Sequence, residues 1–339
     1  MNKSSHKSPN KTQVNSRTLG RTGLSVSEVG LGCWQLGGDF GPVSAATAEA
    51  VIEQAVKEGI NFFDTADVYG NGISEQYLGK ILNKLAPEAV IATKYGRAAD
   101  TYPDGYSLTD LRDSVRRAQD RLQRDCIDLL QLHCVPEQVL AARHIFDWLR
   151  EVQQEGLINA FGASVETHKE AEICLEHSDL QSLQIIFNLL RQRPIDALFD
   201  RALAQQVGII VRLPLASGML SGKFSKDTAF ATTDHRNYNK DGEAFSVGET
   251  FSGIAFNQGL EIVDILKQSV PEGMTMAQFA MRWILDHDAV TSIIPGASSA
   301  FQVTQNASVS QLPVIDKTTH QRLFAYYEST IEQHIRCPL

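Results

Sequence analysis

No two of the five cysteines in this chain form a CxxC pair, and their number is odd. They lie far apart in the sequence, at Cys33, Cys126, Cys134, Cys174 and Cys337. This distribution argues against a disulfide framework and against a zinc site, and it is typical of a protein in the reducing cytoplasm. We therefore expect a cytoplasmic protein that holds no metal ion.

Runs of Lys and Arg are also missing, and the formal net charge at pH 7 is -9. An acidic chain without a basic run is poorly suited to nucleic acid or to an anionic membrane, so neither is expected as a partner. No apolar stretch approaches the roughly 20 residues that a membrane-spanning helix requires. A local basic pocket for a phosphate group remains compatible with this composition.

The first residues, MNKSSHKSPNKTQVNSR, are basic and polar and contain no apolar segment of the kind found in secretory signals. They resemble a weak transit peptide, but few of them can join a core, so we expect residues 1–14 to form a disordered tail. With 339 residues and 43% hydrophobic content, the chain can form one large α/β domain or two ordinary ones. The regular alternation of elements favours a single domain over residues 15–339.

Short apolar segments alternate with amphipathic helical patterns along most of the chain. After a small hairpin predicted at 18–27, strands are predicted at 27–34, 60–64, 89–93, 127–132, 157–163, 183–187, 208–212 and 290–294. Helices are predicted at 47–58, from an N-cap at Ser74, and at 108–122, 138–154, 169–176, 195–206, 259–268, 275–286, 299–308 and 318–332. The polar segment 216–258 breaks this rhythm and is predicted to be a functional loop.

Polar residues that can take part in catalysis follow several of these strands. They are Asp64, Lys94, His133, Ser164 and Asn188. In an open sheet the ends of distant strands lie too far apart to share one site, whereas in a closed barrel they meet at one mouth. No GxGxxG motif follows the first strand, which further weakens a dinucleotide-binding open sheet. The sequence therefore predicts a (β/α)8 TIM barrel with an N-terminal β-hairpin, a long loop after strand 7 and a C-terminal helix.

Asp64, Tyr69, Lys94 and His133 form a set suited to proton transfer if the barrel brings them together. A free phenol has a pKa of about 10, and a neighbouring ammonium lowers that pKa. Lys94 would supply this charge, while Asp64 would hold Lys94 in place and keep it protonated. His133 would donate a hydrogen bond to a carbonyl oxygen. The set lacks a nucleophile–base pair, so a hydride would have to come from a cofactor.

Each of these residues also has an ordinary structural interpretation. Asp64 could cap a turn, and Tyr69 and Lys94 could lie on the surface. His133, taken alone, could be a core histidine with satisfied hydrogen bonds. The shared place of Asp64, Lys94 and His133 at the ends of strands favours the catalytic interpretation.

Five segments, in order along the chain, resemble the signatures of the aldo-keto reductase superfamily. They are FDTADVYG, IATKYG, DLLQLHC, the stretch from Gly162 to Ser164, and IPGASSAFQVTQN. The resemblance runs from about Leu31 to Asn306 and implies a barrel that binds NADPH, less often NADH, without a Rossmann fold. It also implies that Tyr69 is the general acid/base and that Asp64, Lys94 and His133 complete a catalytic tetrad.

The resemblance further implies a set of cofactor-binding residues. Cys33 and Trp34 fall where the family borders the nicotinamide, and Ser164 and Gln184 resemble the pair that holds the carboxamide. Val165 departs from the polar residue that often follows this serine. The other residues implied are Asp64, Arg212, Pro214, Leu215, Gly218, Lys223, Arg236, Gly296, Ser298, Gln302, Gln305 and Asn306.

Arg212 and the adenosine end differ from many members of this family. Arg212 stands where many members stack Tyr or Trp on the nicotinamide, and its charge would disfavour the oxidised, cationic ring. Segment 214–224, PLASGMLSGKF, resembles the pyrophosphate loop. Ser298 and Gln302 replace cations that often bind the 2′-phosphate, and Arg236 is expected to substitute for them.

These features favour an NADPH-dependent oxidoreductase that reduces the aldehyde or ketone group of a small-molecule substrate. A second hypothesis is a non-catalytic subunit that senses nicotinamide nucleotides, resembling potassium-channel β subunits. The third is a Schiff-base aldolase that uses Lys94. The presence of His133 beside Asp64, Tyr69 and Lys94 favours turnover.

Overall fold

The computed structural model describes residues 14–339, and its centre is one parallel sheet of eight strands. The strands follow chain order: β3 (Leu31–Gly32), β4 (Phe62–Asp64), β5 (Val90–Tyr95), β6 (Ile127–His133), β7 (Ile158–Ser164), β8 (Ser182–Ile186), β9 (Gly208–Arg212) and β10 (Val290–Ile293). Most of the predicted tail lies outside the described residues. Val14, however, was assigned to that tail and is instead 5% exposed and packed in the core.

The first and last strands of the sheet meet, so the sheet is closed. Parallel bridges join Val29 to Ile293 and Gly32 to Gly296. Gly32 permits this approach, because a Cβ at that position would lie 2.5 Å from the Ile294 carbonyl oxygen. The predicted (β/α)8 barrel is therefore confirmed.

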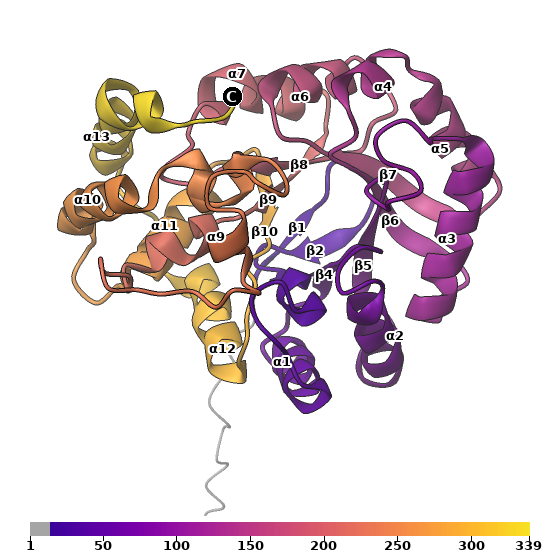
Figure 1. The fold of residues 1–339 in the computed structure, drawn as a ribbon, viewed down its shortest axis with the longest axis horizontal. Coiled ribbons are helices and arrows are strands. Elements are labelled where there is room, and N and C mark those ends of the chain that lie inside the picture. Colours follow the sequence, from indigo (N-terminus) through magenta and orange to yellow (C-terminus); the bar gives the residue numbers. More distant parts are fainter. Residues whose placement is uncertain (1–13) are drawn as a thin grey trace, which may run out of the picture.

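Helices surround the sheet on its outer side (Figure 1). They are α1 (Ala45–Lys57), α2 (Ile73–Leu85), α3 (Leu108–Leu122), α4 (Glu137–Ala141), α5 (His144–Gln154), α6 (His168–Leu175), α7 (Pro194–Ala197), α8 (Phe199–Ala204), α10 (Phe256–Leu266), α11 (Met276–Leu285), α12 (Ala300–Ser308) and α13 (Lys317–Tyr326). Ser107, Thr275 and Ser299 cap α3, α11 and α12, each accepting a backbone N–H with its side chain. Such caps satisfy donors that have no partner inside the helix.

Three helix predictions are wrong in detail. The single helix expected at 138–154 is divided by Arg143, whose φ of 68° ends the helical path between α4 and α5. The helix expected at 195–206 is divided at Leu198, where φ is -130°. Ser74 is not an N-cap: Gly72 holds that position, and the buried Ser74 hydroxyl donates to the Cys33 carbonyl at 3.0 Å.

The predicted hairpin is confirmed and closes the end of the barrel where the strands begin. Its strands are β1 (Ser16–Thr18) and β2 (Ser25–Ser27), which pair antiparallel. Leu19 and Val26 are fully buried against the barrel interior. The interior side chains that they join are Phe62, Val90, Ala92, Leu129, Ala160, Ile210 and Ile294. Arg17 fastens the hairpin by donating to the carbonyls of Leu285 and Val290 at 2.8 and 2.7 Å.

The long loop after β9 is confirmed, although it contains short helices. These are η2 (Ala216–Ser221), α9 (His235–Tyr238), η3 (Val247–Glu249) and η4 (Phe251–Gly253), and α10 begins three residues before the predicted Gly259. The His235 N–H donates to the Asp39 carbonyl at 3.0 Å, and the His235 ring packs edge-on against Phe40. The loop therefore links the β9 side of the barrel mouth to its β3 side.

The predicted C-terminal helix is confirmed as α13, which continues into a π-helical turn, η7 (Tyr327–Ile331), and a 3₁₀ turn, η8 (Glu332–His334). Beyond it, the Arg336 side chain donates to the carbonyls of Lys240 and Gly253, both at 2.9 Å. The end of the chain is thereby attached to the long loop. None of the helices in residues 14–339 is long and apolar enough to cross a bilayer.

Leu19→Ala is expected to lower the free energy of unfolding by about 2–5 kcal/mol, because it opens a cavity where the hairpin fills the barrel. Leu203→Ala is the matched control, since Leu203 is 49% exposed on α8 and should change stability little. Urea denaturation of both variants measures the difference. Equal stability of the two variants would show that the hairpin does not fill the barrel end.

Candidate active site

Strand alternation brings the predicted catalytic side chains together inside the barrel. Phe62 of β4, Ala92 of β5 and Leu129 of β6 belong to the interior cluster. Because side chains repeat every two residues on one face of a strand, Asp64 and Lys94 also point inward. They lie at the carboxyl ends of their strands, where TIM barrels carry their active sites.

Asp64 and Lys94 form a buried ion pair at this mouth. Lys94 Nζ donates to Asp64 Oδ1 at 2.5 Å and to the Thr65 carbonyl at 2.8 Å. The other carboxylate oxygen, Oδ2, accepts from Gln131 Nε2 at 2.9 Å and Gln184 Nε2 at 2.7 Å. Burial acts to lower the pKa of Lys94, but the charge of Asp64 and the contact with Tyr69 outweigh it and raise that pKa. Lys94 is therefore held as an ammonium.

Tyr69 lies within reach of this ammonium. Lys94 Nζ is 3.3 Å from the Tyr69 hydroxyl and 4.9 Å from the centre of its ring. Burial raises the pKa of Tyr69 to about 12, although Lys94 acts in the opposite direction. As predicted, the Lys94 ammonium acts to lower the pKa of Tyr69. The resulting pKa is nevertheless raised, because desolvation has the larger effect.

His133 faces the edge of the Tyr69 ring, with the ring centres 5.9 Å apart. Burial, followed by the charges of Lys94, Arg97 and Arg212, lowers the pKa of His133 well below its usual range. The imidazole is therefore neutral. Its Nδ1 is buried and has no hydrogen-bond partner among the described residues.

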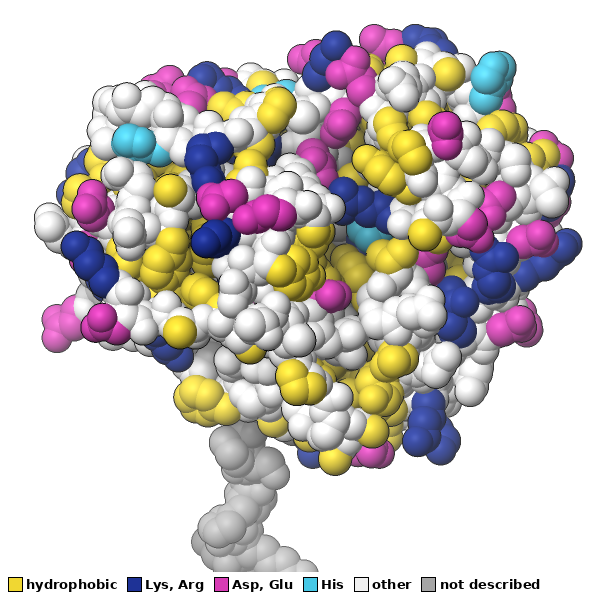
Figure 2. Space-filling model, viewed as in Figure 1, with side chains coloured by type: hydrophobic (Ala, Val, Ile, Leu, Met, Phe, Trp, Pro, Cys, Tyr) yellow, Lys and Arg dark blue, Asp and Glu magenta, His cyan; other side chains and the backbone are white. Residues whose placement is uncertain are grey.

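Two cavities meet at Tyr69 and His133, and both side chains line both cavities. The smaller has a volume of about 450 Å³ and the larger about 510 Å³. Figure 2 shows the hollow near the centre of this face, with basic, acidic and histidine side chains around it. Every residue predicted to bind the cofactor lines the larger cavity: Cys33, Trp34, Asp64, Ser164, Gln184, Arg212, Pro214, Leu215, Gly218, Lys223, Arg236, Gly296, Ser298, Gln302, Gln305 and Asn306.

Lys94 belongs to the site without lining either cavity, through its contacts with Asp64 and Tyr69. Among the polar residues predicted to converge, Asn188 is the one that lies apart from the site. It lines neither of these two cavities. Its side-chain amide instead donates to the Leu213 carbonyl and to the Ser252 hydroxyl, both at 2.9 Å. Asn188 therefore holds the long loop against the barrel.

The residues of the larger cavity suit a long ligand with a polar, anionic middle. Ser164 Oγ donates to Gln184 Oε1 at 3.2 Å, so these two polar side chains lie together near the tetrad. The backbone of the predicted pyrophosphate loop is strained, with positive φ at Ala216 and Ser217 as well as at Gly218. Strain of this kind is concentrated at ligand-binding loops.

Arg236 lies beside that loop. A Cβ added at Gly218 would lie 3.6 Å from Arg236 Nη1 and 2.9 Å from the Phe224 ring. The Arg236 guanidinium also donates to both oxygens of Asp234, at 2.9 and 2.5 Å, and lies 4.6 Å from the centre of the Phe230 ring. Its position is thus fixed by a carboxylate and by aromatic side chains before any ligand binds.

Arg212, at the end of β9, is held by neighbours from three other elements. One of its Nη atoms donates to the Val165 carbonyl at 3.2 Å and contacts Cys134 Sγ at 3.6 Å. The other lies 3.5 Å from a carboxylate oxygen of Glu249. The positive charge predicted beside the nicotinamide is therefore offset by a carboxylate that was not predicted from the sequence.

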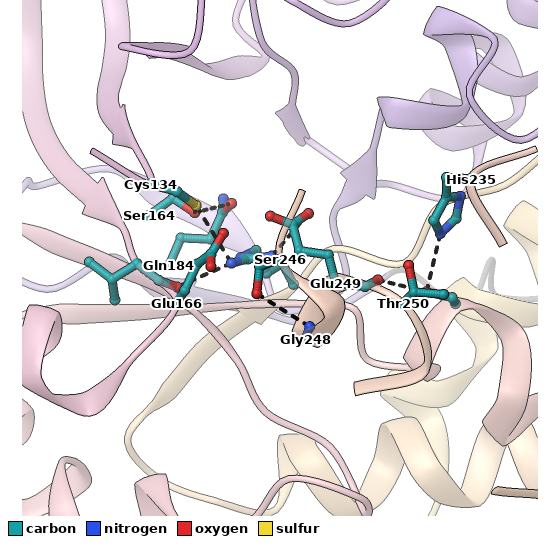
Figure 3. A network of polar contacts seen from close by, with 12 residues as sticks. Cys134, Ser164, Glu166, Gln184, His235, Ser246, Gly248, Glu249 and Thr250 are labelled. Carbon is teal, nitrogen blue, oxygen red and sulfur yellow. Dashed lines mark hydrogen bonds and ion pairs between the residues drawn. The ribbon is translucent and has the colours of Figure 1, made fainter. Parts of the chain in front are cut away.

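Glu249 joins two arginines across the boundary between the cavities. Its carboxylate contacts Arg212 and lies 3.2 Å from Arg97, whose guanidinium also lies 3.3 Å from Glu166. Figure 3 shows Glu249 between Glu166 and Cys134 on one side and His235 on the other. Burial acts to raise the pKa of Glu249, but the charges of Arg212 and Arg97 outweigh it and lower that pKa.

Three potential metal ligands in this network lie within 4.8 Å of one another, namely Cys134, Glu166 and Glu249. Arg97 and Arg212 already occupy the positions of counter-ions to these carboxylates. Burial also raises the pKa of the Cys134 thiol to about 12, so the thiolate that a metal would need is disfavoured. The absence of a metal stays a prediction.

The closed barrel and the geometry at its mouth agree with a comparison of sequences. A profile of the Aldo/keto reductase family matches residues 28–328. The chain belongs to the aldo-keto reductase family. This assignment confirms the resemblance seen in the five sequence segments.

Relatives of this aldo-keto reductase match it over most of their length. It is 30% identical over 330 residues to the pyridoxal 4-dehydrogenase of Microbacterium luteolum, covering 86% of this chain and 91% of that protein. A probable voltage-gated potassium channel subunit beta of Arabidopsis thaliana is 26% identical over 323 residues, with 88% and 92% covered. The holo form of an aldo-keto reductase from Bacillus halodurans superposes with a TM-score of 0.76 at 25% identity, covering 96% of this chain and 100% of that one.

Four residues around the site of this aldo-keto reductase were not predicted from its sequence: Gln131, Arg97, Glu166 and Glu249. Gln131 carried a usable signal, because it lies two residues before His133 on β6 and so shares its inward face. Arg97 and Glu166 follow β5 and β7 by two residues, where a polar side chain also attracts attention. Glu249 carried no such signal within a loop that lacks periodicity.

Lys94→Met is expected to lower the free energy of unfolding by about 3–5 kcal/mol, because it leaves the buried Asp64 carboxylate without its cation. The double variant Asp64→Asn/Lys94→Met removes both charges and should recover much of this loss. Guanidinium denaturation of the two variants measures the comparison. A double variant no more stable than the single one would show that the charge of Asp64 is not the source of the loss.

Proposed function

We propose that this protein is an NADPH-dependent oxidoreductase that reduces aldehyde or ketone groups to alcohols by hydride transfer, with Tyr69 as general acid. The position of Tyr69 supports this most directly. Its side chain lines both cavities, and its hydroxyl lies 3.3 Å from Lys94 Nζ. A carbonyl compound in the smaller cavity and a nicotinamide in the larger one would meet beside that hydroxyl.

In the proposed reaction Tyr69 starts protonated, because burial raises its pKa to about 12 while Lys94 acts to lower it. As negative charge develops on the carbonyl oxygen, the Tyr69 hydroxyl donates its proton to that oxygen. The phenolate that remains is stabilised by the neighbouring Lys94 ammonium. When bound, a reduced nicotinamide supplies the hydride.

The other two members of the tetrad have supporting roles in this proposal. Asp64 keeps Lys94 charged and fixed through the 2.5 Å contact. His133 is neutral because burial and three nearby cations lower its pKa. A neutral imidazole can orient the carbonyl oxygen by one hydrogen bond without adding a second acidic group beside it.

We propose NADPH rather than NADH as the cofactor on the family resemblance. The positive charges of Lys223 and Arg236 in the larger cavity suit the phosphates of either nucleotide. Arg236 lies beside Gly218, which fits a contact with the pyrophosphate better than the predicted contact with the 2′-phosphate. At the adenosine end, Gln302 Oε1 accepts from the Ser298 N–H at 2.7 Å and from its hydroxyl at 3.1 Å. A cytoplasmic location remains part of this proposal.

A second candidate function is a nicotinamide-sensing subunit, and the similarity to the potassium channel subunit supports it. The neutral His133 beside Tyr69 favours turnover over sensing alone. The Schiff-base aldolase is disfavoured. Asp64 and Tyr69 raise the pKa of Lys94, so Lys94 is an ammonium, and an ammonium is not a nucleophile. Borohydride trapping with substrate would give a Lys94 adduct only for the aldolase.

Tyr69→Phe is expected to lower kcat for carbonyl reduction by about a hundredfold or more, because it removes the proton donor. The affinity for NADPH should stay nearly unchanged, since the aromatic ring is retained. Steady-state absorbance of NADPH and quenching of tryptophan fluorescence measure the two quantities. A variant that keeps its activity would remove Tyr69 from the proposed role.

Arg212→Tyr is expected to raise the affinity for NADP⁺ relative to NADPH by roughly threefold, because it removes a positive charge beside the cationic ring. The effect is modest, since Glu249 at 3.5 Å already offsets part of the Arg212 charge. Arg212→Lys is the control that keeps the charge and should leave the ratio unchanged. Calorimetric titration with both nucleotides measures the ratio of NADP⁺ affinity to NADPH affinity in each variant. An equal ratio in Arg212→Tyr and Arg212→Lys would refute the charge effect.

A further inference from the structure

We propose that the smaller cavity discriminates between substrates by charge: it favours carbonyl compounds that carry a cationic group and rejects those that carry a carboxylate or phosphate. This inference rests on the proposed function, because the smaller cavity is taken as the substrate site. His133 lines both cavities and marks the place where they meet as a ligand site. It is 6% exposed and has a buried Nδ1 with no partner among the described residues.

Carboxylates outnumber cations in the lining of this cavity. Its carboxylates are those of Asp39, Glu166, Glu170 and Glu249. Arg97 is the cation of the same lining, and it lies within 3.3 Å of both Glu166 and Glu249. An anionic substrate that pairs with Arg97 would therefore lie against two carboxylates that already offset the charge of this guanidinium.

Asp39 and Glu170 hold hydrogen bonds from neutral donors. Asp39 accepts from the Trp34 indole N–H at 2.8 Å and from the Tyr238 hydroxyl at 3.4 Å. Glu170 accepts from the backbone N–H groups of Glu166 and Thr167 at 2.8 and 3.1 Å. These donors carry no formal charge, so they do not neutralise either carboxylate. For Glu170, in the first turn of α6, the helix dipole offsets part of the charge.

Counting Arg212, which pairs with Glu249 from the side of the larger cavity, two guanidiniums face four carboxylates. Burial and the charge of Glu249 raise the pKa of Glu166, which disfavours its charged form. The other three carboxylates still outnumber the two guanidiniums, so the net charge around the substrate is negative. A substrate anion is repelled by this field, whereas a cation is attracted.

The walls between the carboxylates are aromatic, which adds a second preference for cations. Trp34, Tyr69, Tyr102, Tyr238 and Phe245 line the smaller cavity. A quaternary ammonium is attracted to the faces of such rings, and an anion is not. The combination of aromatic walls and carboxylates suits a substrate with an apolar body and a positive charge.

The test compares three benzaldehydes that differ only in the group on a para methylene: carboxylate, hydroxyl or trimethylammonium. One methylene insulates the ring only in part, so each kcat/KM is divided by the rate constant for reduction of the same aldehyde by an uncharged amine–borane. We expect kcat/KM with NADPH to fall in the order cation, neutral, anion, with cation and anion differing by roughly tenfold or more at low salt. Added salt should narrow this difference, because it screens the charges.

Two variants remove one charge each while keeping the hydrogen bonds. Asp39→Asn can still accept from Trp34, and Glu170→Gln can still accept the backbone N–H groups that cap α6. Each should reduce the ratio of cation to anion severalfold. Glu172→Gln is the matched control, since Glu172 is exposed on the same helix and lines neither cavity, so its ratio should equal that of the unchanged enzyme.

Equal kcat/KM for the anion and the cation, or a ratio that neither Asp39→Asn nor Glu170→Gln changes, would overturn the inference. Failure of the proposed function has a different signature, in which none of the three aldehydes is reduced. In that event calorimetric binding of the three corresponding alcohols in the presence of NADP⁺ still measures the charge preference. Tighter binding of the cationic alcohol than of the anionic one would support the cavity's selectivity, and the reverse order would refute it.

Discussion

The ion pair of Asp64 and Lys94 is the interaction on which the site depends. Both side chains are almost fully buried, and taking two charges out of water costs several kcal/mol for each ion, so the pair persists only if its other hydrogen bonds are satisfied. Gln131, Gln184 and the Thr65 carbonyl satisfy them from three different strand ends. The closed barrel is what places these groups around one point.

The same arrangement sets the protonation state of Tyr69. Burial and Lys94 act on its pKa in opposite directions, and burial is the stronger influence. In the proposed reaction this balance suits a general acid, which must hold its proton until charge appears on the substrate. Desolvation and the ion pair thus have complementary effects, since one keeps the acid protonated and the other stabilises its conjugate base.

The fold was largely predictable, because apolar strands and amphipathic helices alternate and the period of two residues shows which side chains point inward. The interruptions of the helices at Arg143 and Leu198 were not predictable. Neither residue is a helix breaker, and tertiary packing decides their conformation. Asp64, Lys94 and His133 could be chosen because strand ends mark them. Glu249 could not, because its contacts with Arg97 and Arg212 depend on the path of an irregular loop.

The contact between the N-terminal hairpin and the last strand, β10, also affects when the protein can fold. Arg17 and Val290 are hydrogen-bonded across 273 positions of sequence. Contacts this remote form slowly, because a long chain must be closed before they contribute any stability. During synthesis the hairpin therefore emerges long before its partners in β10. Leu19 and Val26 thus cannot complete their packing until Ile294 has been synthesised, and apolar side chains left uncovered in this interval favour aggregation.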